Sequence, residues 1–185
     1  MQHKGTKTLE TARLILRRAQ LSDAQAMFDN WASDPEVTKY LTWPTHENVA
    51  ATRWVLENWN GQYDNDECYL WLITLKGEDL PIGSISVVSL DNRIRKAEIG
   101  YCIGSAWWHR GFTSEAMRAV IDYLFDEVGM NRIEARHDPR NPHSGGVMRK
   151  CGMQYEGTAR AADRFRSTRT RIHRGSLSRC RKPSL

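Results

Sequence analysis

The 185-residue chain is 40% hydrophobic and 26% charged, a composition that favours one globular domain with a sizeable core and excludes a mostly disordered chain. It contains no run of about 18 apolar residues and its N-terminal residues are polar, so we expect neither a transmembrane helix nor a signal peptide. The net charge of +5 arises from residues 163–185, which hold eight of the 27 basic and one of the 22 acidic residues; this excludes a nucleic-acid-binding surface over the rest of the chain.

The first part of the chain predicts short strands and helices in alternation. Ser22 as N-cap and Gln25 as its capping-box partner predict the start of a helix, and Asp34-Pro35 predicts its end. The spacing of apolar residues predicts the other elements of this part: a strand over 13–18, a helix that carries Ala51, Val55 and Trp59, a strand buried on both faces over 69–75, and strands around Ile85 and over 97–103.

The remainder of the chain predicts two more helices around one strand. An apolar stripe over 117–128 predicts a helix that Gly129 ends. Residues 132–137 predict a strand, and a short helix follows with Asn141 as N-cap and Pro142 in its first position. Early strands followed by strand, helix, strand and helix indicate an α/β fold, with a mixed central sheet that is partly parallel.

The most informative segment is 103–116, IGSAWWHRGFTSEA. A predicted strand ends here, and a loop with Arg110 and Gly111 opens into the predicted helix, whose first N–H groups and dipole favour an anion. Gly111 lets the backbone approach a phosphate, and Thr113 and Ser114 add hydroxyl groups. Neither GxxxxGK[ST] nor GxGxxG is present, so a nucleoside-triphosphate loop and a dinucleotide fingerprint are excluded. On these residues alone, a capped helix after a turn explains the segment as well as a phosphate site does.

This segment resembles the acyl-CoA-binding motif Q/R-x-x-G-x-G/A of the GNAT superfamily of N-acetyltransferases. It is most similar to the RimJ/RimL-like branch, the ribosomal-protein N-acetyltransferases, whose motif commonly runs W-G-K-G-Y-x-T-E-A. Residues 108–116 match that motif, with Thr113 in place of the second small residue. Three further stretches resemble the family in the expected order, TARLILRRAQLSDA, AEIGYCIG and NPHSGGVMRKCGMQYEG, so the resemblance extends over residues 8–160.

The resemblance implies a GNAT-type sheet that splays at the cofactor site and is flanked by about four helices. It also implies an enzyme, an N-acetyltransferase that takes the acetyl group of acetyl-CoA, its co-substrate. The acceptor would be the primary amine of a protein N-terminus or of a small molecule, which attacks the thioester directly. The cofactor-binding residues that the resemblance implies are Cys102, Ile103, His109, Arg110, Gly111, Phe112, Thr113, Ser114, Asn141 and Ser144.

The resemblance also implies two catalytic candidates. Glu98 lies two residues before Gly100, where related enzymes often carry a carboxylate proposed as the base that deprotonates the amine. Ser144 is the candidate donor to the departing thiolate, and a backbone N–H near Ile103 would stabilise the oxyanion. The alternatives are structural: an ion-paired strand carboxylate for Glu98, and capping of the short helix for Ser144.

The cysteines and histidines indicate no metal site. Cys68, Cys102, Cys151 and Cys180 are scattered, without a close pair, which suits a reducing cytoplasm better than a disulfide scaffold or a zinc site. His137 and His143 lack the spacing of metal ligands. We therefore expect a cytoplasmic monomer or homodimer without metal or membrane contact.

The resemblance ends near residue 162, and we expect a GNAT domain over 1–162 and a basic C-terminal tail over 163–185. Family members close the sheet here with two apolar strands, whereas this segment has few large apolar residues, although 168–172 alternate weakly as one strand would. A divergent tail, a basic RNA-binding extension and a reading-frame shift near codon 164 are the three explanations. The second leads to a rival hypothesis, in which a catalytically weakened GNAT fold contacts RNA or ribosomes through its tail.

Overall fold

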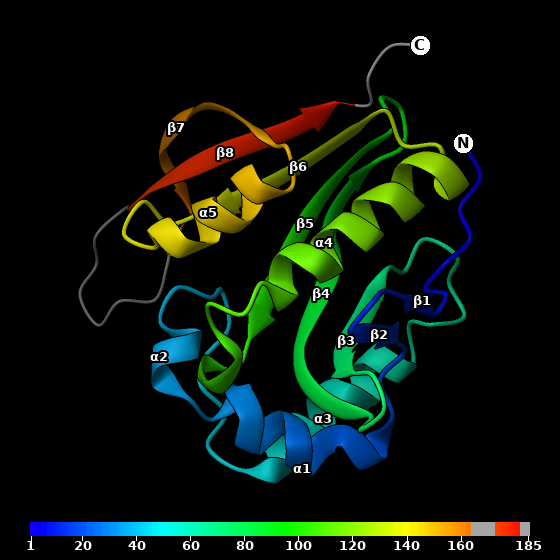
Figure 1. Cartoon of the computed structure of the whole chain (residues 1–185), viewed down its shortest axis with the longest axis vertical. Helices are drawn as coiled ribbons and strands as arrows, with labels where there is room; N and C mark the ends of the chain where they lie inside the picture. Colours follow the sequence, from blue (N-terminus) through cyan, green and yellow to red (C-terminus); the bar gives the residue numbers. More distant parts are fainter. Residues whose placement is uncertain (164–172, 182–185) are drawn as a thin grey trace.

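A computed structural model describes residues 1–163 and 173–181, and Figure 1 shows its architecture. Within these residues one sheet of eight strands runs in the order β1-β2-β3-β4-β5-β6-β8-β7. Neighbouring strands are antiparallel except β5 and β6, which are parallel, so the sheet is mixed as the sequence predicts. The strands are β1 (Leu9–Glu10), β2 (Leu14–Arg17), β3 (Leu70–Leu75), β4 (Leu80–Asp91), β5 (Lys96–Ile103), β6 (Arg132–His137), β7 (Gln154–Asp163) and β8 (His173–Arg181).

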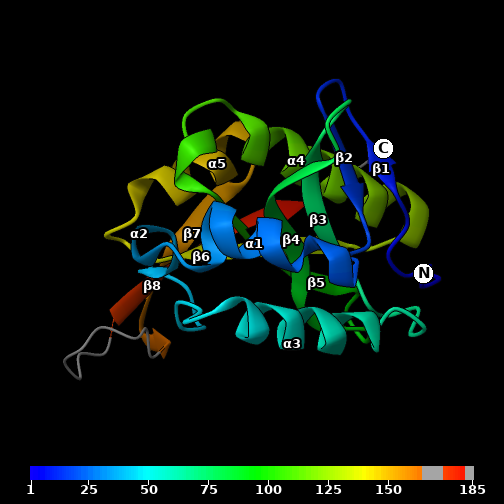
Figure 2. The same cartoon turned by 90° about the horizontal axis from the view of Figure 1, so that it is seen from below.

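Helices cover both sides of the sheet. Figure 2 shows α3 on one side of the strands and α4 and α5 on the other. The helices of the described residues are α1 (Ala24–Met27), α2 (Pro35–Thr38), α3 (Val49–Asn60), α4 (Phe112–Asp122) and α5 (Pro142–Lys150), with the 3-10 turns η1 (Leu21–Asp23) and η3 (Ser105–Trp107) and the π turns η2 (Phe28–Ala32) and η4 (Tyr123–Val128). None of these described helices has the length and apolar character that a membrane span requires.

The apolar core has two parts, one on each side of the sheet. Trp71 and Ile73 of β3 belong to the cluster beneath α4, while Leu72, the residue between them, packs with Trp31 and Leu56 in the other cluster. Successive residues of a strand point to opposite faces, so β3 is buried on both. This confirms the doubly buried strand that the sequence predicts.

The first helical segment starts differently from its prediction. Gln20 rather than Ser22 is the N-cap, and η1 begins at Leu21. The carboxylate of Asp23 accepts a hydrogen bond from the Gln20 N–H at 2.7 Å and binds the Arg17 guanidinium through both oxygens at 2.8 Å. Asp23 fixes this turn because its carboxylate binds both Arg17 of β2 and the backbone of Gln20. The capping rules used for the prediction consider only residues within the turn, so they do not include the contact with Arg17.

The next helices lie close to their predicted positions. Asp34 caps α2 by accepting from the Glu36 N–H at 2.9 Å, and Gly129, with φ of 83°, ends the η4 turn after α4. In α3 the fully buried positions are Thr52 and Leu56, one residue beyond the predicted stripe. That face of α3 is the one enclosed by the cluster of Trp31.

Residues 173–181 form β8, a strand that the sparse apolar residues of the tail did not indicate at this position. β8 pairs along the whole of β6, from Arg132↔Arg181 to His137↔Ser176, and with β7 on its other side. Backbone N–H and C=O groups pair whatever side chains they carry, so scarcity of apolar residues does not prevent a strand here. The expected strand over 168–172 lies outside the described residues, and the division at residue 162 stays a prediction.

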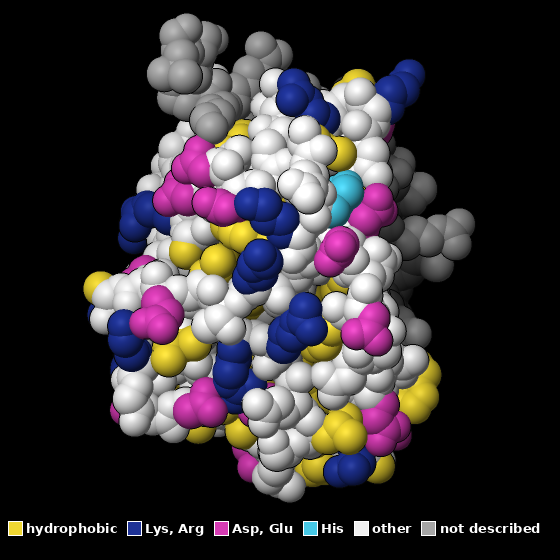
Figure 3. Space-filling view, turned by 90° about the vertical axis from the view of Figure 1, so that its right-hand side faces the viewer, with side chains coloured by type: hydrophobic (Ala, Val, Ile, Leu, Met, Phe, Trp, Pro, Cys, Tyr) yellow, Lys and Arg dark blue, Asp and Glu magenta, His cyan; other side chains and the backbone are white. Residues whose placement is uncertain are grey.

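Charge on the body of the molecule is mixed, as the sequence predicts. On the face in Figure 3, Lys and Arg side chains are interspersed with Asp and Glu side chains. The tail's basic side chains, on which the RNA hypothesis rests, lie outside the described side chains.

A chain ending at Asp163 tests the role of β8. Without β8 the unpaired N–H and C=O groups of β6 form a sheet edge, and we expect the free energy of unfolding to fall by at least about 3 kcal/mol for the six lost residue pairs. Urea unfolding followed by circular dichroism measures this, with a chain ending at Arg181 as the control that should match the full chain. An unchanged midpoint for the shorter chain would contradict the pairing.

Candidate active site

The parallel contact between β5 and β6 ends before β5 does. The two strands pair from Lys96↔Arg132 to Ile99↔Ala135, while β5 continues to Ile103, still paired with Gly83 of β4. Figure 1 shows the two strands diverging beneath α4 and α5. We call this opening, between residues 100–103 of β5 and the end of β6, the split. It leaves one backbone edge of β5 available to an extended ligand, as the splayed sheet of the prediction requires.

β4 fixes the position of β5 along the split. A Cβ on Gly83 would lie 2.4 Å from the carbonyl oxygen of Cys102, so the two backbones meet here without room for a side chain. Cys102 as a whole residue is 8% exposed, and its thiol lies 3.3 Å from the Ser84 hydroxyl. Burial raises the pKa of this thiol, so it stays protonated at neutral pH. Cys102 therefore offers no thiolate to the site, and its carbonyl oxygen points to β4.

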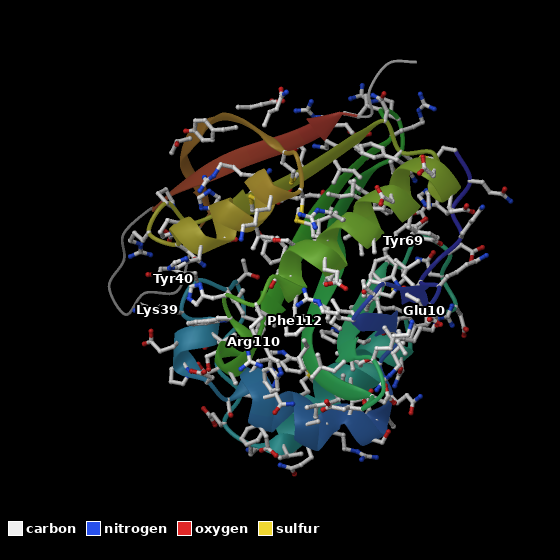
Figure 4. All side chains as sticks on the ribbon, viewed as in Figure 1. Glu10, Lys39, Tyr40, Tyr69, Arg110 and Phe112 are labelled. Carbon is white, nitrogen blue, oxygen red and sulfur yellow. The ribbon has the colours of Figure 1, made fainter. Side chains whose placement is uncertain are left out.

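The loop from β5 to α4 has the geometry of an anion site. His109 and Gly111 both have left-handed backbones, with φ of 61° and 79°. The first helical hydrogen bond of α4 runs from Glu115 N–H to Gly111 O at 3.1 Å. The N–H groups of residues 112–114 come before it, so no preceding turn of the helix offers them a carbonyl acceptor. Figure 4 shows Arg110 at this end of α4. These N–H groups, at the positive end of the helix dipole, suit a phosphate.

Two contacts fix where this loop begins. A Cβ on Gly104 would lie 2.2 Å from Asn30 O, so η3 sits directly against η2. The indole N–H of Trp108 donates to Ile103 O at 2.9 Å and folds the loop back over the end of β5. The start of α4 is therefore held close to the split.

An ion pair that the sequence did not predict fastens α4 to the other end of the sheet. Glu115 accepts hydrogen bonds from Thr11 Oγ1 at 2.6 Å, from Arg13 N–H at 2.9 Å and from Arg13 Nε at 2.7 Å. Arg13 also donates to Arg110 O at 3.1 Å, and its guanidinium lies 4.4 Å from the centre of the Phe112 ring. Burial works against the charge on Glu115, but the hydrogen bonds from Thr11 and Arg13 outweigh it and lower its pKa. In the sequence, Arg13 and Glu115 each lie in a stretch that resembles the family, but nothing there indicated that the two residues meet.

The start of α5 forms the far side of the split. Asn141 caps this helix by accepting from the Ser144 N–H at 3.3 Å, as predicted, so Ser144 is not the cap. The phenol of Tyr101 on β5 lies 2.8 Å from Ser144 O and 2.9 Å from Ser144 Oγ. A Cβ on Gly145 would lie 2.7 Å from His137 Nε2, which shows how closely α5 packs on β6. The hydroxyl of Ser144 thus faces β5 across the split.

A ring contact also joins the loop to α5. The imidazoles of His109 and His143 meet edge to face, with ring centres 4.9 Å apart. No cluster of three His, Cys, Asp or Glu side chains that could hold a metal ion occurs in the part of the chain that the structure describes.

The two catalytic candidates lie on different faces of the sheet. Glu98 forms an ion pair with Arg136 of β6, Oε1 to Nε 3.3 Å. By strand alternation Glu98 shares the face of Cys102, which packs in the cluster of Trp31, whereas Ser144 lies on the α4 and α5 side. The structure therefore gathers the cofactor-binding candidates along the split and sets Glu98 and Ser144 on opposite sides of it.

Comparison with known proteins gives a consistent result. The family profile described as an acetyltransferase (GNAT) domain matches residues 13–154. The uncharacterized N-acetyltransferase p20 of Bacillus licheniformis is 34% identical over 171 residues, covering 92% of this chain and 96% of that protein. The [ribosomal protein uS5]-alanine N-acetyltransferase of Escherichia coli is 27% identical over 140 residues, covering 64% of this chain and 72% of that protein. The solved alpha-N-protein acetyltransferase RimL, in complex with coenzyme A, has a TM-score of 0.82 at 17% identity, covering 95% of this chain and 98% of that one.

Gly111→Asp tests the anion site. Gly152, with φ of 78° and no atom within 4 Å of the place that a Cβ would occupy, provides the matched control Gly152→Asp. Both substitutions force a side chain into a left-handed backbone, at a cost of about 1 kcal/mol in stability. Only Gly111→Asp adds a negative charge beside the amides of 112–114, so it alone should lower the affinity for acetyl-CoA, by at least tenfold, about 1.4 kcal/mol, in isothermal titration calorimetry. Equal affinities of the two variants would contradict the site.

Glu115→Gln tests the clamp that Glu115 forms with Arg13, through its pH dependence. Because the pKa of Glu115 is lowered from the ordinary 4.5, the ionised carboxylate stabilises the folded chain above that value, and the stabilisation is lost as the pH falls through the lowered pKa. We expect the thermal midpoint of the wild type to fall more steeply than that of Glu115→Gln as the pH is lowered from the ordinary value of 4.5 through the lowered pKa. Glu57→Gln, which removes an exposed pair with Arg53, should follow the wild type. Parallel curves for all three proteins would contradict the clamp.

Proposed function

The chain belongs to the acetyltransferase (GNAT) family, and we propose that it acetylates the amine of a protein N-terminus by direct attack on acetyl-CoA bound along the split. It is an N-acetyltransferase and uses acetyl-CoA as co-substrate, as its family does. The observation that carries the proposal is that the β5–β6 pairing ends at Ile99 while β5 runs on to Ile103, directly before the loop that leads to the amides of 112–114.

The residues present fit acetyl-CoA. Two negative phosphates match the N–H groups at the start of α4, where Gly111 leaves the backbone bare. The amide-bearing pantetheine arm matches the open edge of β5 near Cys102 and Ile103, which can pair with it as a neighbouring strand would. Asn141 and Ser144 would approach it from α5.

The proposed reaction uses these positions. The nitrogen lone pair of the amine forms a bond to the acetyl carbonyl carbon, and the carbon–sulfur bond breaks with its electron pair going to sulfur. The nitrogen gives up a proton, for which Glu98 is the proposed acceptor. The sulfur gains one from the Ser144 hydroxyl, which solvent restores. A backbone N–H near Ile103 would stabilise the charge on the carbonyl oxygen in the tetrahedral intermediate.

The choice of acceptor is supported by what the relatives act on. One relative carries the name of an alanine N-acetyltransferase of a ribosomal protein, and a structural neighbour is an alpha-N-protein acetyltransferase. The probe is a short peptide that begins with a free alanine, assayed with acetyl-CoA by thiol release and mass spectrometry. Acetylation at the α-amine supports the proposal, whereas transfer to a small diamine and none to the peptide would assign a small-molecule acceptor instead.

Glu98→Gln tests the proposed base. The substitution keeps size and polarity but removes the proton acceptor, so kcat should fall by about a hundredfold while the KM for acetyl-CoA stays within about twofold. Arg136→Gln is the matched control, because it breaks the same ion pair and leaves the Glu98 carboxylate in place. A loss of the same size in both variants would assign Glu98 a structural role, and unchanged turnover in Glu98→Gln would exclude it as the base.

A further inference from the structure

Tyr101 crosses the split at the level where the two strands have just separated. It lies two residues beyond Ile99, the last residue of β5 that pairs with β6. By strand alternation it points to the side of α4 and α5, like Ile99 and Ile103, which are buried in the core beneath α4. Its phenol reaches the first turn of α5, where the carbonyl oxygen and the hydroxyl oxygen of Ser144 both lie within hydrogen-bond distance of it.

The protons of this contact can be assigned from chemistry. Ser144 O can only accept, so the single phenolic proton of Tyr101 goes to it across 2.8 Å. The hydroxyl oxygens of Tyr101 and Ser144 lie 2.9 Å apart, so in this arrangement Ser144 Oγ–H donates to the oxygen of Tyr101. A second arrangement is open to the same atoms: Tyr101 turns its proton to Ser144 Oγ, and Ser144 turns its own proton away from Tyr101.

We propose that Tyr101 is a positioning residue that holds the Ser144 hydroxyl toward the sulfur of coenzyme A by exchanging between these two arrangements. This rests on the proposed function, since it concerns how the thiolate leaves. When negative charge builds on the sulfur, Ser144 directs its proton there, and Tyr101 donates its own proton to Ser144 Oγ. The hydroxyl of Ser144 is hydrogen-bonded to Tyr101 in both arrangements, so it is not left without a partner as its proton turns.

Tyr101 supplies a hydrogen bond and keeps its own proton. Burial raises the pKa of its phenol above the ordinary value of 10, an effect that the hydrogen bond to Ser144 only partly offsets. The phenol is therefore neutral at neutral pH, and the proton that the sulfur receives comes from Ser144.

A double-mutant cycle tests the inference. We compare the wild type, Tyr101→Phe, Ser144→Ala and the double variant by thiol release from acetyl-CoA, with the alanine peptide as acceptor. Tyr101→Phe should lower kcat about tenfold in the wild type, with the KM for acetyl-CoA unchanged, and should have no effect in the Ser144→Ala background. Tyr123→Phe is the matched control, because it removes a buried phenol that donates to a backbone carbonyl, Gly5 O, at the same 2.8 Å but far from the split. It should lower the thermal midpoint as Tyr101→Phe does and leave kcat unchanged.

The outcomes separate this inference from the proposed function. An equal fall of kcat for Tyr101→Phe in both backgrounds, or no fall in either, overturns the inference while the enzyme activity stands. A rise in the KM for acetyl-CoA with kcat intact also overturns it and assigns Tyr101 to cofactor binding. A wild type that binds acetyl-CoA in calorimetry yet releases no thiol, with or without the peptide, contradicts the proposed function and the inference together.

Discussion

The parallel contact between β5 and β6 is the constraint on which the rest of the structure depends. Its four residue pairs are the only place in the described sheet where the half built from β1–β5 meets the half built from β6, β8 and β7. β5 stays paired with β4 to its last residue, and β6 stays paired with β8 to His137. Each of the two strands therefore stays with its own antiparallel neighbour, β5 with β4 and β6 with β8. The split opens where the direction of β5 departs from that of β6.

An open seam inside a sheet leaves polar backbone without partners, which is costly unless something else pairs with it. That cost explains why an extended, amide-bearing ligand suits the split. Side-chain contacts also join the two sides of the split: Trp108 folds over the end of β5, the His109 and His143 rings join the two helix starts, and the Tyr101 phenol spans the gap. The Arg140 guanidinium also lies 5.5 Å from the centre of the Tyr40 ring, so the segment after α2 is tied to the segment before α5.

Much of the site could be predicted because its signals are local. The loop around Gly111, the cap at Asn141 and the doubly buried β3 follow from spacing along the chain, and the order of motifs identified the family. Contacts between distant segments could not be predicted this way. The Arg13–Glu115 clamp joins residues 102 positions apart, and the Asp23 contact that displaces the predicted cap depends on an arginine of a neighbouring strand. β8 was missed for another reason, because strand prediction reads side chains whereas its pairing is made by the backbone.

The close approach at Gly83 has a consequence for how this protein can vary. Gly83 belongs to β4 and its backbone is taken up by strand pairing, yet any other amino acid there would place a carbon 2.4 Å from Cys102 O and push the end of β5 into the split. Substitution at position 83 is therefore limited by the close approach of the β4 and β5 backbones, and not by contact with a ligand. Among descendants of this chain that keep the activity, residue 83 should be frozen as glycine, while exposed neighbours such as Val88, on the same strand, remain free to drift.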